Sequence, residues 1–202
     1  MIDTRDKILD TAEQLFADQG YSATSLRQII ASAEVNLAAI HYHFGSKEEL
    51  LDELIQRKVE SVNQERLDRL DRLEQAANGK APRVEDVLLA FFMPTADVAE
   101  ANPQFVRVMG RIHSEGLMPG IVQKHFQPTA ARFIGALRRA LPGLPEAEFG
   151  WRVHFMMGAM AHTMCGTPIL PVASGDFHGR MRKLVTFLSA GFRAPANNME
   201  EK

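Results

Sequence analysis

The side chains best suited to binding chemistry lie together in the segment VNLAAIHYHFGSK, residues 35–47. Ile40 and Phe44 are four positions apart, so both can face a core while the opposite side of a short helix stays open. Gly45 is a natural end for that helix. A slim helix with small residues at its leading end fits a DNA major groove, roughly 12 Å wide. We therefore predict a recognition helix, whose candidate contact residues are Asn36, Leu37, Ala38, His41, Tyr42, His43 and Lys47.

Two short helices are expected before this segment. Apolar residues repeat with helical period over residues 4–19, and Gly20 follows as a stop. Ser25 with Gln28 three residues later is a capping-box signature and opens a helix that runs to about residue 33. A tight turn over residues 34–36 leads into the recognition helix. Three short helices, the last two joined by a turn, predict a helix-turn-helix.

The contacts of such a domain with DNA can be divided by chemistry. Phosphates are held by polar side chains and helix N-termini, and the Ser25 cap leaves backbone N–H groups available there. Leu37 and Ala38 lack hydrogen-bonding groups, so they are expected to touch thymine methyls, and Arg27 and Gln28 to add polar discrimination. The alternative is that Leu37 packs internally and Tyr42 closes the small core.

The rest of the chain is also expected to be helical, because no stretch alternates with period two. A long helix should begin at Ser46 and end near residue 77, and Pro94 should interrupt the next one. The pattern predicts an all-α protein of about nine helices, with a three-helix DNA-binding domain at residues 1–50, a larger helical domain at 51–193, and a frayed tail at 194–202. The expected later helices cover residues 84–93, 105–115, 121–126, 128–141, 146–165 and 176–192, with a loop between the last two.

Composition limits the other function classes. The 202 residues are 46% apolar and carry a net charge of −2, so bulk charge does not indicate a nucleic-acid partner. Residues 21–47, however, hold Arg27 and Lys47 against Glu34 alone. The single cysteine, Cys165, cannot form an internal disulfide, and no signal peptide or membrane-length apolar run is present. These features favour a soluble cytoplasmic protein without a membrane association.

RDKILDTAEQLFADQGYSATSLRQIIASAEVNLAAIHYHFGSKEELL resembles the N-terminal DNA-binding domain of the TetR family of bacterial transcriptional regulators. The resemblance runs without a gap from Arg5 to about Leu51. It implies that the third helix enters the major groove and that Tyr42 and Lys47 contact phosphates. Arg27 would reach a base edge or a phosphate. His41 stands where the family usually has Tyr, so its contact is the least determined.

The last two expected helices are apolar on more than one face, so each must bury more than one face. In the family these helices form a four-helix bundle with a partner, which implies a homodimer on a near-palindromic double-stranded DNA operator. The alternative is that a larger internal core absorbs both faces. The predicted interface consists of Trp151, Phe155, Gly158, Ala159, His162, Met181, Leu184, Leu188 and Phe192.

The second domain is rich in Met and Phe, which suits either a filled core or a pocket for an irregular apolar ligand. NLAAIHYHFGSK, WRVHFMMGAMAHTMCG and FLSAGFRA resemble the fatty-acid-responsive, PsrA-like branch of the family. That resemblance implies a long-chain fatty acid or acyl-CoA effector; the alternative is a multidrug or efflux-type regulator with another apolar or aromatic effector. The candidate ligand residues are Phe92, Phe105, Met109, His113, Phe126, Phe133, Trp151, Phe155, Met156 and His162.

Other chemistries have weaker support. His154 and His162 share a helical face, with Cys165 close by, but no carboxylate accompanies them and paired histidines in a helical core are more often structural. The sequence has no phosphate-binding Gly-rich loop, nucleophile elbow or HExxH motif. We therefore expect no metal, no cofactor and no catalytic residue. The rival classes are an all-helical enzyme and a dimeric binding module that does not bind DNA; selection of DNA from a random pool would separate them from a regulator.

Overall fold

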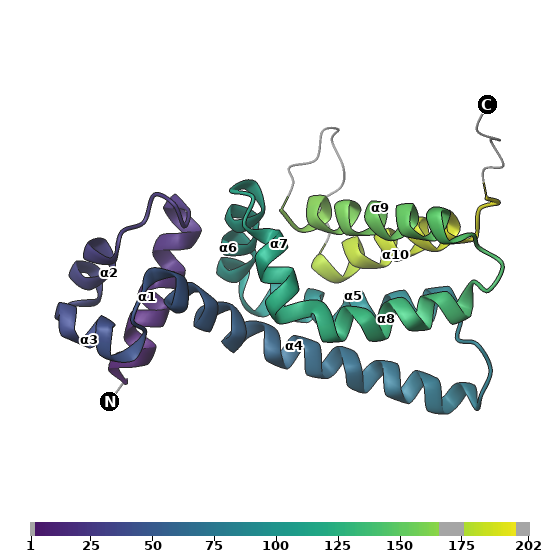
Figure 1. Cartoon of the computed structure of the whole chain (residues 1–202), viewed down its shortest axis with the longest axis horizontal. Coiled ribbons are helices and arrows are strands. Elements are labelled where there is room, and N and C mark those ends of the chain that lie inside the picture. Colours follow the sequence, from purple (N-terminus) through teal and green to yellow (C-terminus); the bar gives the residue numbers. More distant parts are fainter. Residues whose placement is uncertain (1–2, 166–175, 197–202) are drawn as a thin grey trace. The chain divides into compact units, whose positions relative to one another are not determined.

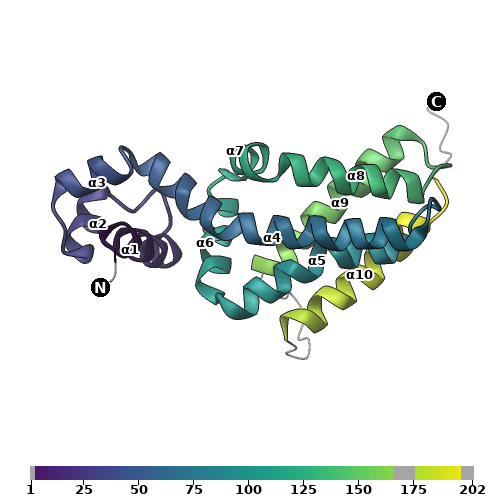
Figure 2. The same cartoon turned by 90° about the horizontal axis from the view of Figure 1, so that it is seen from below.

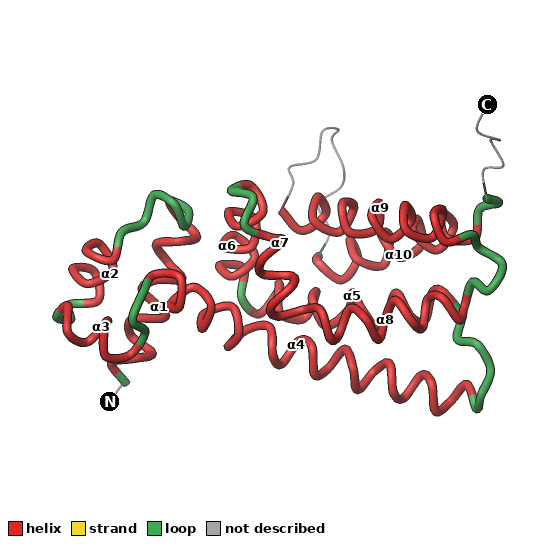
Figure 3. The backbone as a smooth tube through the Cα atoms, viewed as in Figure 1, coloured by secondary structure: helices red, strands yellow, loops and turns green. Residues whose placement is uncertain are grey.

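Helices joined by turns make up the computed structural model, which describes residues 3–165 and 176–196; none of these residues forms a strand (Figure 3). The all-α prediction is confirmed. The chain divides into two compact units, the first formed by Met1–Ser61 with Asn102–Gln127 and the second by Val62–Ala101 with Pro128–Lys202. The sequence analysis predicted one domain boundary, near residue 50. In the structure, residues 102–127 belong to the same unit as the N-terminal helices.

The N-terminal part of the first unit contains α1 (Thr4–Gln19), α2 (Leu26–Ala33), α3 (Leu37–His43) and the start of the long helix α4 (Lys47–Ala77) (Figure 1). Each of the first three helices begins at a side-chain cap. The Asp3 carboxylate accepts a hydrogen bond from the N–H of Arg5, and Ser25 and Gln28 form the predicted capping box. Asn36 caps α3 by accepting from the N–H of Ala39. These caps fix where the helices of the helix-turn-helix start.

The first unit is completed by α6 (Pro103–Ser114), α7 (Met118–Ile121) and a π-helical segment, η1 (Val122–Phe126). α6 packs against α1. The expected helix at 121–126, separate from the one that follows, was wrong in detail: α7, η1 and the next helix, α8 (Gln127–Ala140), follow one another without a break. Pro128 lies in the first turn of α8, as expected.

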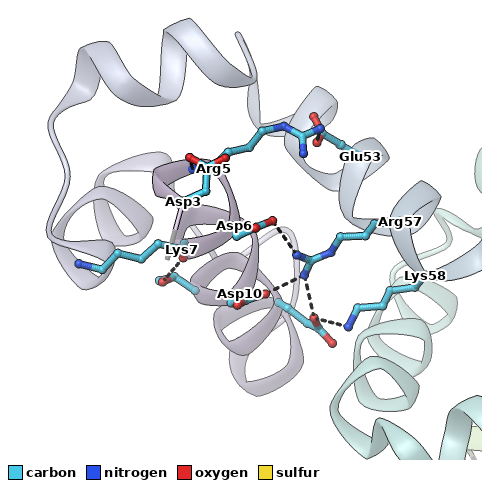
Figure 4. A network of polar contacts seen from close by, with 10 residues as sticks. Asp3, Arg5, Asp6, Lys7, Asp10, Glu53, Arg57 and Lys58 are labelled. Atoms are coloured by element: carbon cyan, nitrogen blue, oxygen red, sulfur yellow. Dashed lines mark hydrogen bonds and ion pairs between the residues drawn. The ribbon is translucent and has the colours of Figure 1, made fainter. Parts of the chain in front are cut away.

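Ion pairs tie α1 to the first turns of α4 (Figure 4). The Arg57 guanidinium lies 2.7 Å from the Asp10 carboxylate and 3.4 Å from that of Asp6. Glu13 is buried, and its carboxylate lies 3.3 Å from the Lys58 ammonium and 3.7 Å from Arg57. A buried carboxylate is tolerated only when it is paired, so these cations fix the register between α1 and α4.

The second unit contains the remainder of α4, α5 (Val84–Ala101), α8, α9 (Glu146–Cys165) and α10 (Phe177–Arg193). α10 packs along α5 and against α9 (Figure 2). Arg152 on α9 is buried and donates hydrogen bonds to the carbonyl oxygens of Phe192 and Ala194, which closes the C-terminal end of α10. The core of this unit includes Leu70, Val87, Leu88, Phe91, Phe92, Phe133, Leu137, Phe149, Met156, Met181, Leu184, Leu188 and Phe192.

The expected break at Pro94 was wrong, because α5 continues through it to Ala101. Proline removes one intrahelical hydrogen bond and disturbs the preceding turn. Here the fully buried Arg66 of α4 lies across that turn: Nε donates to the Phe91 carbonyl at 2.9 Å, and Nη2 donates to the Thr95 hydroxyl at 2.7 Å. The guanidinium also stacks 4.1 Å from the centre of the Phe91 ring. Tertiary contacts thus overrode the local signal.

The loop expected over residues 166–175 lies outside the described residues, as does the tail from residue 197. In the described part of the chain, no helix is both long and apolar enough to cross a membrane.

Candidate nucleic-acid interface

The outward face of α3 exposes apolar and aromatic side chains. Leu37 is 53% exposed and Tyr42 is 86% exposed, whereas Ile40 and Phe44 are buried in the core of the first unit. The alternative in which Leu37 packs internally and Tyr42 closes the core is therefore wrong. Ala38 is also exposed, so the leading end of α3 offers a small apolar surface. Such a surface can approach base edges and thymine methyls closely.

Arg27 on α2 is exposed and makes no hydrogen bond or ion pair with any residue that the structure describes. An arginine in this condition can turn toward a phosphate or a guanine edge without giving up a contact in the protein. Among the predicted contact residues it combines charge with freedom of movement. It is the strongest candidate for polar readout.

Several other predicted contact residues instead hold the helix ends. The Gln28 side-chain oxygen accepts from the Ser25 N–H at 2.7 Å, and the Ser25 hydroxyl accepts from the Gln28 N–H at 3.3 Å. The Asn36 side chain accepts from the N–H of Ala39 at 2.8 Å. His41 Nδ1 lies 3.1 Å from the Gly45 carbonyl oxygen, at the C-terminal end of α3. His43 is half-buried and its ring packs against Phe44.

Lys47 is bound to the loop between α1 and α2. Its ammonium donates to the carbonyl oxygens of Tyr21 at 3.0 Å and Thr24 at 2.9 Å, and it lies 4.1 Å from the centre of the Tyr21 ring. The Thr24 hydroxyl is buried and donates to the Gly20 carbonyl. These contacts orient the chain just before α2, which makes Lys47 part of the scaffold of the interface.

The sequence analysis did not predict the contacts among Tyr21, Ser22 and Glu115. The Glu115 carboxylate, at the end of α6, accepts hydrogen bonds from the backbone N–H groups of Tyr21 at 3.0 Å and Ser22 at 2.8 Å, and from the Ser22 hydroxyl at 2.7 Å. Burial raises the pKa of the Tyr21 phenol to about 12, aided by its hydrogen bond to Glu48. No local pattern could reveal a contact between residues more than 90 positions apart.

The turn between α2 and α3 contains Glu34 in the left-handed region, with φ of 52°. Its carboxylate lies 3.5 Å from the Lys7 ammonium. A side chain in that region is uncommon outside glycine and asparagine, so the turn carries local strain.

The second unit exposes aromatic side chains on its last two helices. Trp151 and Phe155 on α9 are 59% and 61% exposed, and their rings stack with centroids 5.7 Å apart. Phe187 on α10 is 71% exposed. Gly158 and His162 are exposed and Ala159 is half-buried on the same side of α9. Exposed aromatic clusters of this kind mark interaction surfaces.

The α10 residues predicted for the dimer interface are buried in the core of the second unit. This part of the prediction was wrong, because their periodic stripe faces α5 and α9 within the unit, and almost none of their surface remains for a partner. These residues are Met181, Leu184, Leu188 and Phe192. Periodicity identifies a buried face but does not say which element covers it.

The predicted effector residues are divided between the two units. Phe92, Phe133 and Met156 are core residues of the second unit, whereas Trp151, Phe155 and His162 are on its surface. The first unit holds the buried Phe105, the half-buried Met109 and Phe126, and the exposed His113.

A surface groove of about 330 Å³ lies between α5 and α10, and none of the predicted effector residues lines it. No group of three His, Cys, Asp or Glu residues that could hold a metal ion occurs in the described part of the chain, and the side chain of Cys165 lies outside that part.

The comparisons with known proteins cover both units. A family model described as bacterial regulatory proteins, tetR family, matches residues 8–54, and one described as tetracyclin repressor-like, C-terminal domain, matches residues 89–191. The repressor Rv3405c of Mycobacterium tuberculosis is 29% identical over 158 residues, which are 72% of this chain and 70% of that protein. The regulator LmrA of Bacillus subtilis is 37% identical over 78 residues, or 38% of this chain. The chain spans 30% of the length of YttP and 42% of the length of LmrA, two Bacillus subtilis relatives.

Solved structures share the fold at lower identity. A TetR-family regulator from Bordetella parapertussis superposes with a TM-score of 0.63 over 100% of both chains, at 18% identity. The fatty acid degradation regulator FadR from Bacillus halodurans gives a TM-score of 0.61 over 96% of this chain and 99% of that one, also at 18% identity. The helix-turn-helix geometry and the two matching family models, the second of which covers about half of the sequence, lead to one conclusion: this chain belongs to the TetR family of bacterial transcriptional regulators.

Proposed function

We propose that the protein is a ligand-responsive transcriptional repressor that binds a near-palindromic DNA operator as a homodimer. The observation that carries the proposal is the exposed face of α3 together with Arg27 of α2, which is unpaired among the described residues, on a scaffold where a side chain caps the N-terminus of each of α1, α2 and α3. In this arrangement Leu37 and Ala38 meet thymine methyls in the major groove, and Tyr42 reaches a phosphate. Arg27 supplies the polar contact to a base edge or a phosphate.

Selection of bound DNA from a random pool tests the proposal directly. The expected result is an enriched motif with two related half-sites, because a two-fold dimer presents two copies of α3 one DNA turn apart or a multiple of it. Failure to enrich any motif would remove the regulator function and leave the enzyme or the DNA-free binding module.

Arg27→Ala should then weaken binding to the selected operator by about tenfold or more, without changing thermal stability. The matched control is Arg83→Ala, which removes an exposed arginine from the second unit. Equal affinities for both variants would show that Arg27 does not touch DNA.

The effector we propose is a long-chain acyl compound. The supporting observations are the likeness to the PsrA-like branch, the Met- and Phe-rich core of the second unit, and the fold shared with a regulator named for fatty acid degradation. An acyl ligand that fits one arrangement of the helices better than another would shift the population away from the spacing that DNA requires.

The effector proposal is tested by adding fatty acids and acyl-CoAs of graded chain length to a preformed operator complex. Release that increases with chain length supports it, since each buried methylene contributes about 0.8 kcal/mol. Release by flat aromatic compounds alone would favour the efflux-type alternative.

A further inference from the structure

The loop between α1 and α2 is held from two sides by opposite charges. The Lys47 ammonium, at the start of α4, donates hydrogen bonds to the carbonyl oxygens of Tyr21 and Thr24. The Glu115 carboxylate, at the end of α6, accepts hydrogen bonds from the N–H groups of Tyr21 and Ser22. Peptide dipoles in the loop are therefore bound at both their negative and their positive ends. We call residues 20–24, with Lys47 and Glu115, the loop clamp.

The Glu115 carboxylate packs closely against the backbone at Gly20. A Cβ atom added at Gly20 would lie 2.3 Å from Glu115 Oε1, and Gly20 has φ of +93°, a region that other residues rarely adopt. Glycine at this position thus leaves the space that the carboxylate fills. Nearby, Arg111 of α6 donates to the Asp18 carbonyl at 3.0 Å, so α6 also binds the C-terminal end of α1 with a cation.

The charge state of Glu115 suits this role. Burial opposes its ionisation, but the hydrogen bonds from Ser22 and Tyr21 and the charge of Lys47 outweigh that effect and lower the pKa of the carboxyl group. The side chain is therefore an anion at neutral pH. Hydrogen bonds to charged groups are stronger than those between neutral groups.

The clamp lies directly before α2. Ser25 caps that helix one residue after Thr24, and Arg27 follows within its first turn. The direction in which α2 leaves the loop decides where the Arg27 side chain and the N-terminal N–H groups of α2 meet DNA. We infer that Glu115, although it lies on α6, is a positioning residue for DNA binding that acts through the Tyr21–Ser22 loop. This inference rests on the proposed function.

The test compares Glu115→Ala with Glu60→Ala in the full-length protein. Glu60 is an exposed carboxylate on the α4 part of the first unit, so both variants lose one negative charge. Operator affinity is measured over a range of salt concentrations, and thermal unfolding is followed in parallel. Glu115→Ala should bind about tenfold more weakly than Glu60→Ala, the equivalent of one charge-assisted hydrogen bond. Its salt slope should be shallower by about one, because a phosphate contact of α2 is lost.

Each outcome is decisive. Weaker binding with an unchanged salt slope would mean that Glu115 only stabilises the fold, and equal binding by the two variants would mean that it does nothing for DNA recognition; both overturn the inference. Absence of selective binding by the wild-type protein would overturn the proposed function together with this inference. If Glu115→Ala unfolds, Ser22→Ala replaces it, because it removes one of the three hydrogen bonds to the carboxylate. It should give a smaller change in the same direction, and no change would again refute the inference.

Discussion

At the scale of single residues, Glu34 shows a conflict between side chain and backbone. It occupies the turn of the helix-turn-helix with a positive φ, and its ion pair with Lys7 is a surface contact. A side chain in the left-handed region costs about 1 kcal/mol or more, whereas a surface ion pair contributes less than about 1 kcal/mol. The strain therefore outweighs the pair.

Glu34→Gly should raise the free energy of unfolding by about 0.5–1 kcal/mol, since part of the relieved strain is offset by the greater entropy of glycine in the unfolded chain. Urea unfolding followed by circular dichroism measures the change. Glu60→Gly is the matched control, because the same substitution within the helix α4 should destabilise by about 1 kcal/mol. A loss of stability in Glu34→Gly would show that the turn gains more from the carboxylate than it loses in strain.

Residue-level prediction from sequence succeeded where the interaction is local. The Ser25–Gln28 capping box and the burial of Ile40 and Phe44 follow from spacing within one helix, and the structure confirms them. The partner of Lys47 could not be predicted in this way. Its two carbonyl acceptors lie more than 20 positions earlier and carry no side-chain signature.

At the scale of elements, the path of α5 depends on another helix. Pro94 alone would interrupt it, and Arg66 of α4 supplies donors on both sides of the break, to Phe91 and Thr95. A buried guanidinium is costly unless its hydrogen bonds are made, and burial lowers the pKa of Arg66 to about 9. The bonds to α5 therefore serve both partners: they satisfy the cation and they support the interrupted helix.

Arg66→Met should lower the free energy of unfolding by about 2–3 kcal/mol, because buried acceptors on α5 lose their donor while the methionine keeps most of the volume. In a Pro94→Ala background the same substitution should cost less, since removal of the proline ring lets this turn of α5 form regular helical hydrogen bonds, and its backbone then depends less on the donors of Arg66. Urea unfolding of the four proteins gives the coupling energy between the two sites. An equal loss in both backgrounds would mean that Arg66 and Pro94 act independently.

Element prediction from the sequence failed for the same physical reason at two places. The Pro94 signal is local, and a donor from α4 overrode it. The apolar stripe of α10 was assigned to a partner subunit, yet α5 and α9 cover it, as the burial of Leu184 and Leu188 shows. Periodicity specifies that a face is buried, and only the packing of the other helices decides what buries it.

At the scale of the whole molecule, the surface left open on the last two helices is aromatic. Trp151, Phe155 and Phe187 each expose more than half of their side chains. Trp151 and Phe155 stack on each other on α9, and Phe187 adds a third exposed ring on α10, so the last two helices carry exposed aromatic surface of the kind found at interaction sites. Since a two-fold interface uses each residue twice, a modest patch on one protomer contributes a larger buried area in a dimer.

Phe155→Glu and Phe187→Glu should each convert a dimer to a monomer, because symmetry would bury two unpaired carboxylates in the interface. Sedimentation equilibrium measures the change, with Ile134→Glu on α8 as the control, since it places the same charge on another exposed apolar residue. The monomeric variants should also lose operator affinity by about a hundredfold or more, because one copy of α3 contacts only one half-site. Monomers that bind the operator as tightly as wild type would separate dimerisation from DNA recognition. A dimer that survives both substitutions would place the interface on another surface.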